Sequence, residues 1–227
     1  MKKLPFLFCF TILACMVSTG CSSKNSPESS EKVTNVKAVS FDDIVRLNDG
    51  KMLDVTYYYD TKRVKELNGR LSSTPVKNKD DAMTVIRELS DIIGCKEPLN
   101  ELEYSEMKLN DNIFAYVFDQ YYNDIPVKDG KVSVSADASG VTTRLINSYV
   151  DVDDIDTKPK ISEESAVKIA REKYSCNTKG EPELMIMEVS RGVSLVWNIK
   201  LDRSKYPDET FIDAENGIIR AEDGPLN

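Results

Sequence analysis

The sequence contains no histidine among its 227 residues. Without an imidazole group, neither a Ser–His nor a Cys–His nucleophile pair can form. A catalytic zinc site without histidine needs several cysteines, and only Cys95 and Cys176 lie beyond the N-terminal segment. No glycine-rich phosphate loop is present either. We therefore expect a protein that is not an enzyme and that holds no metal or cofactor.

The sequence also has fewer basic than acidic residues. The chain has 30 lysines and arginines against 38 aspartates and glutamates, which gives a formal net charge of −8. Nucleic-acid binding requires clustered basic residues that displace counterions from phosphates. Adhesion to anionic lipid headgroups has the same requirement. The composition therefore argues against a nucleic-acid partner and against electrostatic attachment to a membrane.

Long hydrophobic runs are absent except at the N-terminus. Residues 4–17 are mostly apolar and follow Lys2 and Lys3, but the run is short for a permanent membrane helix. Ser18-Thr19-Gly20-Cys21 then places small residues before a cysteine, as in a bacterial lipoprotein cleavage site. We interpret residues 1–20 as a lipoprotein signal peptide, Cys21 as the lipidated residue, and residues 21–40 as a polar, disordered tether. A secretory signal with an incidental cysteine is the alternative.

Both interpretations place the mature protein outside the cytoplasm. With Cys21 lipidated, we expect a palmitate-type anchor that holds the protein on the extracytoplasmic face of the cell membrane. Cleavage before Cys21 would remove two lysines and no acids, so the net charge would fall from −8 to −10.

Cysteines are scarce in the rest of the chain. Cys95 and Cys176 each follow a segment with helical periodicity, so a disulfide between them is conceivable in an oxidising compartment. Two free thiols are the alternative, because sequence does not reveal the geometry that a bridge requires.

Two segments have the periodicity of amphipathic helices. In residues 79–93, apolar side chains recur at helical spacing, with Asn78 or Asp80 as the N-cap and Gly94 at the end. Residues 163–174 repeat the pattern, with Ser162 as the N-cap. In the less regular segment 41–74, residues 52–59 favour a strand and residues 64–67 a short helical turn.

After each helix the periodicity changes to two. Short alternating segments are separated by turns rich in Asp, Asn and Gly, which indicates antiparallel hairpins. Residues 137–140 and 213–217 form similar turns in the two halves. We therefore predict an α+β fold with two modules, at residues 41–157 and 158–227, each an antiparallel meander with one helix packed on a face.

The segment Phe118-Asp119-Gln120-Tyr121-Tyr122-Asn123-Asp124-Ile125-Pro126-Val127 resembles the F-x-Q-x-Y-x-x-I-P-V signature of fungalysin/thermolysin propeptide (FTP) domains. The second module resembles the PepSY domain that follows in those precursors, at Trp197-Asn198-Ile199-Lys200-Leu201 and Phe211-Ile212-Asp213-Ala214-Glu215-Asn216-Gly217. Lys128-Asp129-Gly130 departs from the aromatic-glycine continuation usual in the family.

The resemblance implies a role as chaperone or inhibitor of a metallopeptidase. Because no H-E-x-x-H helix is present, we expect an envelope protein that binds a secreted peptidase in trans. The residues that the signature offers for this contact are Gln120, Tyr122, Ile125, Pro126 and Val127. Hairpin packing is the alternative role for them. The alternative function is binding or scaffolding of a cell-wall enzyme, a sensor protein or wall glycan.

The acidic stretch at residues 151–156 raises the question of calcium. Its spacing departs from the EF-hand loop, because Ile155 stands at the fifth position and Asp156 at the position of the loop glycine. We interpret this stretch as a solvated linker between the modules.

Overall fold

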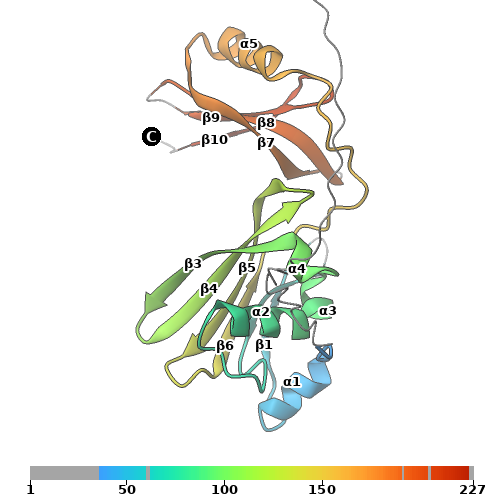
Figure 1. The fold of residues 1–227 in the computed structure, drawn as a ribbon, viewed down its shortest axis with the longest axis vertical. Helices are drawn as coiled ribbons and strands as arrows, with labels where there is room; N and C mark the ends of the chain where they lie inside the picture. The colour runs from blue at the N-terminus through green and yellow to red at the C-terminus, as the bar shows by residue number, and fades with distance from the viewer. Residues whose placement is uncertain (1–35, 60–61, 191, 204–205, 225–227) are drawn as a thin grey trace, which may run out of the picture. The chain divides into compact units, whose positions relative to one another are not determined.

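A six-stranded antiparallel sheet forms the first half of the folded chain (Figure 1). Its strand order is β1-β2-β6-β5-β4-β3, so β1 and β3 are the two edges. The computed structural model describes residues 36–59, 62–190, 192–203 and 206–224, and residues 36–227 make up one unit. The strands are β1 (Asp54–Tyr57), β2 (Val64–Asn68), β3 (Leu102–Asn110), β4 (Ile113–Tyr122), β5 (Ile125–Asp137) and β6 (Thr142–Asn147).

A second antiparallel sheet has the order β7-β8-β9-β10. It joins the first sheet through one parallel pair, Val127 of β5 with Ile186 of β7. The predicted α+β class is confirmed, while this join through β5 was not predicted. The strands are β7 (Thr178–Val189), β8 (Gly192–Leu201), β9 (Glu209–Asp213) and β10 (Ile219–Asp223).

Four helices accompany the first sheet, where the sequence predicted one. The predicted helix at residues 79–93 is interrupted at Leu89, which ends one helix and begins the next. The helices are α1 (Phe41–Leu47), α2 (Lys79–Glu88), α3 (Ser90–Ile93) and α4 (Pro98–Glu101) in the first half, and α5 (Glu163–Tyr174) in the second.

The helix ends follow local sequence signals. The Asn78 side chain accepts hydrogen bonds from two backbone N–H groups of the first turn of α2, and Gly94 ends α3 with a positive φ of 86°. Ser162 accepts from the backbone of Ser165 at the start of α5. These caps confirm the predictions of Asn78, Gly94 and Ser162.

Two expectations for the N-terminal part were wrong or imprecise. Residues 64–67 form strand β2 and not a helical turn, because β2 pairs with β1 on one side and with β6 on the other. Val39, which the prediction placed in the tether, packs against the first core and donates a backbone hydrogen bond to Glu88. The predicted signal peptide, Cys21 and tether residues 21–35 lie outside the described residues.

Each sheet packs its own core against its helices. Ala82, Val85 and Ile86 of α2 belong to the same cluster as the buried residues of β2, β4, β5 and β6. Ala166 and Ala170 of α5 pack against a separate cluster from β8 and β9. A third cluster lies where the first sheet meets the second, and contains Val127, Val150, Val152, Ile186, Leu195 and Ala214.

An aspartate holds each of the two Asp-Gly turns. Asp137 Oδ1 accepts from the backbone N–H groups of Ser139 and Val141. Asp213 Oδ1 accepts from the backbone N–H groups of Glu215 and Asn216. The turns differ in length, because the Asp137 carbonyl accepts from Gly140 and the Asp213 carbonyl from Gly217, one residue further along.

No helix in the described ranges is long and apolar enough to cross a membrane.

Both remaining cysteines are free thiols in the structure. Cys95 is buried in the first core and Cys176 packs beside the α5 cluster, so the conceivable disulfide is not formed there. Burial, and then the Glu101 carboxylate, raises the pKa of the Cys95 thiol to about 12.

We expect iodoacetamide at pH 8 to alkylate Cys176 at least about tenfold faster than Cys95, because the thiolate is the reactive form. Peptide mass spectrometry of the native protein measures both rates, and the urea-unfolded protein is the control. Equal native rates, or a Cys95–Cys176 linked peptide without reductant, would contradict the structure.

Candidate functional site

The signature residues form the β4–β5 hairpin. Asn123 and Asp124 make its two-residue turn with positive φ values of 48° and 64°, the conformation that suits the right-handed twist of the flanking strands. Tyr122 and Ile125 pair across this turn. The sequence therefore fixes the hairpin register at the point where the chain approaches the second sheet.

Gln120 connects this hairpin to the segment that leaves the first sheet. Its side chain is 1% exposed. Its Nε2 donates to the Val150 carbonyl oxygen at 2.7 Å, and Val150 N donates to its Oε1 at 2.8 Å. Gly130 makes room for this side chain, since a Cβ at that position would lie 2.6 Å from Gln120 Oε1. A glycine at position 130 is therefore required by the packing of Gln120.

The other predicted contact residues lie in the cluster between the sheets. Val127 is buried and pairs with Ile186, and Tyr122 and Ile125 pack against the same cluster. Pro126 pairs with Tyr121 in the hairpin. The structure thus brings the signature residues together within the chain. Contact with a partner stays a prediction, and the half-buried Tyr122, Ile125 and Pro126 are the members with exposed surface.

A broader hollow lies on the first sheet, on the face opposite its core. Phe114, Tyr116 and Phe118 of β4 point into the core, so the alternating residues between them face the other way. The hollow measures about 690 Å³, and apolar, hydroxyl and charged side chains all line it. Apolar lining residues are Ile113, Ala115, Val117 and Ile146; charged ones are Lys108, Asp111, Lys131 and Arg144.

The three basic residues that line the hollow are paired inside the chain, and Lys108 Nζ lies 2.8 Å from Glu106 Oε1. Arg144 Nη2 lies 2.8 Å from Glu66 Oε2, and Lys131 Nζ lies 3.0 Å from Asp119 Oδ1. The Glu66 pKa lies below its ordinary value, because the Arg144 guanidinium and Asn68 donate hydrogen bonds to the carboxylate. Since these groups are partly solvated, the pairs orient side chains at the rim and add little stability.

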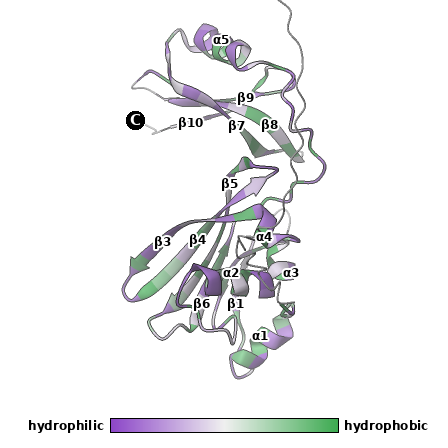
Figure 2. Ribbon diagram, viewed as in Figure 1, coloured by the Kyte–Doolittle hydropathy of each residue, from purple (hydrophilic) through white to green (hydrophobic). Residues whose placement is uncertain are grey.

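Strand β3 borders the same sheet as a free edge. It pairs with β4 on one side, and no other described strand pairs with it. All of its residues except Leu102 are exposed. Met107 and Leu109 are exposed large apolar residues of this strand. Figure 2 shows that β3 contains both hydrophilic and hydrophobic segments. Sequence reasoning missed β3, because its residues lack a buried face and therefore a clear alternation.

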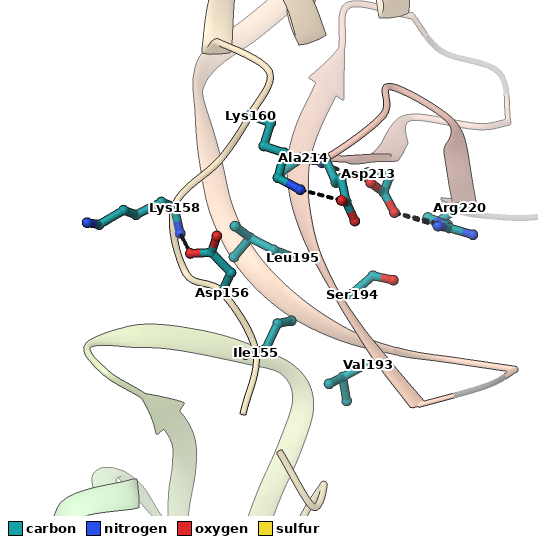
Figure 3. A pocket seen from close by; sticks show the side chains of 11 residues that line it. Ile155, Asp156, Lys158, Lys160, Val193, Ser194, Leu195, Asp213, Ala214 and Arg220 are labelled. Atoms are coloured by element: carbon teal, nitrogen blue, oxygen red, sulfur yellow. Dashed lines mark hydrogen bonds and ion pairs between the residues drawn. The ribbon is translucent and has the colours of Figure 1, made fainter. Parts of the chain in front are cut away.

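A smaller hollow of about 190 Å³ lies between the linker and the second sheet (Figure 3). Its most buried polar residue, Asp213, has both carboxylate oxygens occupied. Oδ1 holds the turn, and Oδ2 accepts from Arg220 Nε at 2.7 Å. At the rim, Lys160 Nζ pairs with Glu215. Because these charges satisfy one another, we interpret this hollow as structural.

Nothing in the described part of the chain brings three or more acidic or cysteine side chains together in a group suited to a metal ion. The acidic linker at residues 151–156 is thus not such a group, and the calcium interpretation gains no geometric support.

The β4–β5 hairpin lies within a segment that matches a known protein family. Residues 115–149, from within β4 to just beyond β6, match the model of the fungalysin/thermolysin propeptide motif. The first half therefore carries a propeptide-like motif, as the signature predicted. The C-terminal domain of YpeB from Bacillus megaterium is a similar solved structure, with 16% identity and a TM-score of 0.40 over 84% of this chain and 100% of that chain. No curated protein matches. The PepSY resemblance of the second half stays a prediction.

We expect the substitution Gln120→Leu to lower the free energy of unfolding by about 2–4 kcal/mol, because it leaves the buried N–H and C=O of Val150 without partners. Urea unfolding measures the change. The matched control is Asn100→Leu, which removes an exposed side-chain amide on α4. Similar losses in both variants would show that the Gln120 hydrogen bonds do not hold the junction.

Proposed function

We propose that this protein is a non-catalytic binding module that restrains or chaperones a secreted metallopeptidase in trans. The observation that carries the proposal is the propeptide motif at residues 115–149 in a chain that contains no histidine. A propeptide acts on its enzyme through surface complementarity, and the first sheet offers surface for that purpose.

The contact that we propose uses the edge of β3 and the adjoining hollow. An unpaired strand edge accepts an extended segment through backbone hydrogen bonds. Met107 and Leu109 pair with Tyr116 and Phe114, so they supply exposed apolar surface on the core side of this edge. The paired charges of the hollow lie on the opposite face of the sheet, and they limit which segments fit there. A strand added to β3 would contact both faces. The signature hairpin holds this sheet against the second one and supports the contact indirectly.

We expect Leu109→Arg to weaken binding to the peptidase at least about tenfold, because it places a long charged side chain on an apolar contact surface. The matched control is Leu99→Arg, since Leu99 is 56% exposed on α4 and Leu109 is 61% exposed on β3. The measurement is co-precipitation and inhibition of the secreted metallopeptidases of the producing cell.

Two results would reject the proposal. One is the absence of both binding and any effect on peptidase activity. The other is equal binding by the two variants, which would remove β3 from the interface. Capture of a cell-wall enzyme, a sensor protein or wall glycan in place of a peptidase would favour the scaffolding alternative.

We also propose that a lipid on Cys21 anchors the module to the extracytoplasmic face of the cell membrane. The support is the sequence Ser18-Thr19-Gly20-Cys21 after an apolar run. Cys21→Ala should move the protein from the membrane fraction to the soluble fraction and abolish palmitate labelling. Unchanged fractionation and labelling would contradict the anchor.

A further inference from the structure

A hollow of about 260 Å³ lies where the β4–β5 hairpin meets the second sheet. Residues 119–121 and 126–131 line it from the hairpin side. Met185, Asn198, Glu209 and Phe211 line it from β7, β8 and β9. The hollow adjoins the open face of the first sheet at Lys131, which lines both hollows, and it includes no residue of β3.

A buried acceptor in this lining has no donor. The Asn198 side chain is 7% exposed. Its Nδ2 donates to Glu209 Oε2 at 3.5 Å, whereas no hydrogen-bond donor of the described chain reaches its Oδ1. Reversing the amide would place Oδ1 against the Glu209 carboxylate, so the observed orientation is the favourable one. Buried acceptors are almost always satisfied, which points to a donor from outside the chain.

The cations of the lining are already engaged. Lys128 Nζ lies 3.2 Å from Asp129 Oδ2 and 3.1 Å from Asp223 Oδ2. Partial burial lowers the Lys128 pKa, but the hydrogen bonds to Asp223 and Asp129 outweigh this, so its pKa is raised and the ammonium stays charged. Lys131 pairs with Asp119. Among the described residues, therefore, neither ammonium group of the lining pairs with its remaining carboxylate.

That remaining carboxylate is Glu209. Its one side-chain hydrogen bond in the described structure is the long contact from Asn198. Lys200 stands opposite Glu209 in the β8–β9 ladder, but the described residues show no ion pair between them. The hollow thus offers a carboxylate and an amide oxygen on adjacent strands, which together complement a cation that has several N–H donors.

The walls suit the methylene stem of such a group. Pro126, Val127, Met185 and Phe211 are apolar lining residues. The Phe211 ring already packs against a cation, since Lys128 Nζ lies 4.7 Å from the ring centroid. An arginine combines an aliphatic stem with a planar fork of five N–H donors, whereas a lysine ends in a compact ammonium.

We propose that this hollow receives an arginine side chain of the bound polypeptide, with Asn198 Oδ1 and the Glu209 carboxylate accepting hydrogen bonds from its guanidinium group. The identity of the bound polypeptide as a peptidase rests on the proposed function. The site itself does not, because a small guanidinium compound tests it without any partner.

The probe is agmatine, titrated into the detergent-solubilised full chain labelled with ¹⁵N. We expect saturable NMR shifts of the Asn198 side-chain amide and of the Asn198 and Glu209 backbone amides, with a dissociation constant of about 1 mM, as suits so small a ligand. Butylamine should bind at least about threefold more weakly, and butanol should give no saturable shift.

Two variants change the affinity in opposite directions. Glu209→Gln should weaken agmatine binding at least about threefold, and Asn198→Asp should strengthen it at least about twofold by adding a carboxylate. The matched control is Glu181→Gln, which removes the same charge from an exposed position on β7 outside the hollow and should leave the affinity unchanged.

Equal shifts with agmatine and butanol would overturn the proposal. The aliphatic stem alone would then account for the binding, and Asn198 Oδ1 and the Glu209 carboxylate would accept nothing from a guanidinium group. Agmatine binding that neither Glu209→Gln nor Asn198→Asp alters would overturn it as well, since the probe would be bound elsewhere. Neither result bears on the proposed peptidase binding, which the Leu109→Arg variant of β3 tests separately.

Discussion

The two hydrogen bonds between the Gln120 side chain and the Val150 backbone hold the β4–β5 hairpin to the segment that leaves the first sheet. This segment continues into the linker before α5. The same contact therefore fixes the position from which the chain enters the second half of the fold. Val127 then reaches β7 and pairs with Ile186. A buried amide that uses both its donor and its acceptor has few alternative geometries, which is why it defines the junction.

This constraint explains the position of the signature residues. They resemble a recognition motif in the sequence, yet in the fold Gln120 and Val127 are buried between two sheets. Their packing leaves the first sheet with an open face and a free edge at β3. We propose that the buried signature residues maintain the scaffold and that the partner binds along β3. Contact of the partner with the half-buried Tyr122, Ile125 and Pro126 stays a prediction.

Local signals in the sequence predicted much of the fold. Asn78 and Ser162 cap their helices through neighbouring backbone groups, so the information lies within a few residues. Strands β2 and β3 were missed because pairing across the sheet determines them. The role of Gln120 was hidden for the same reason, since Val150 lies 30 residues away in the chain. Likewise Asn198 becomes notable only when its missing donor is seen in three dimensions.

The central claim is that a polypeptide partner docks on the edge of β3. Hydrogen–deuterium exchange of the protein, alone and with its captured peptidase, tests this directly. The account predicts that those amides of residues 103–110 that point away from β4 exchange fast in the free protein and become protected in the complex. Unchanged exchange along β3, with protection confined to other elements, would contradict it.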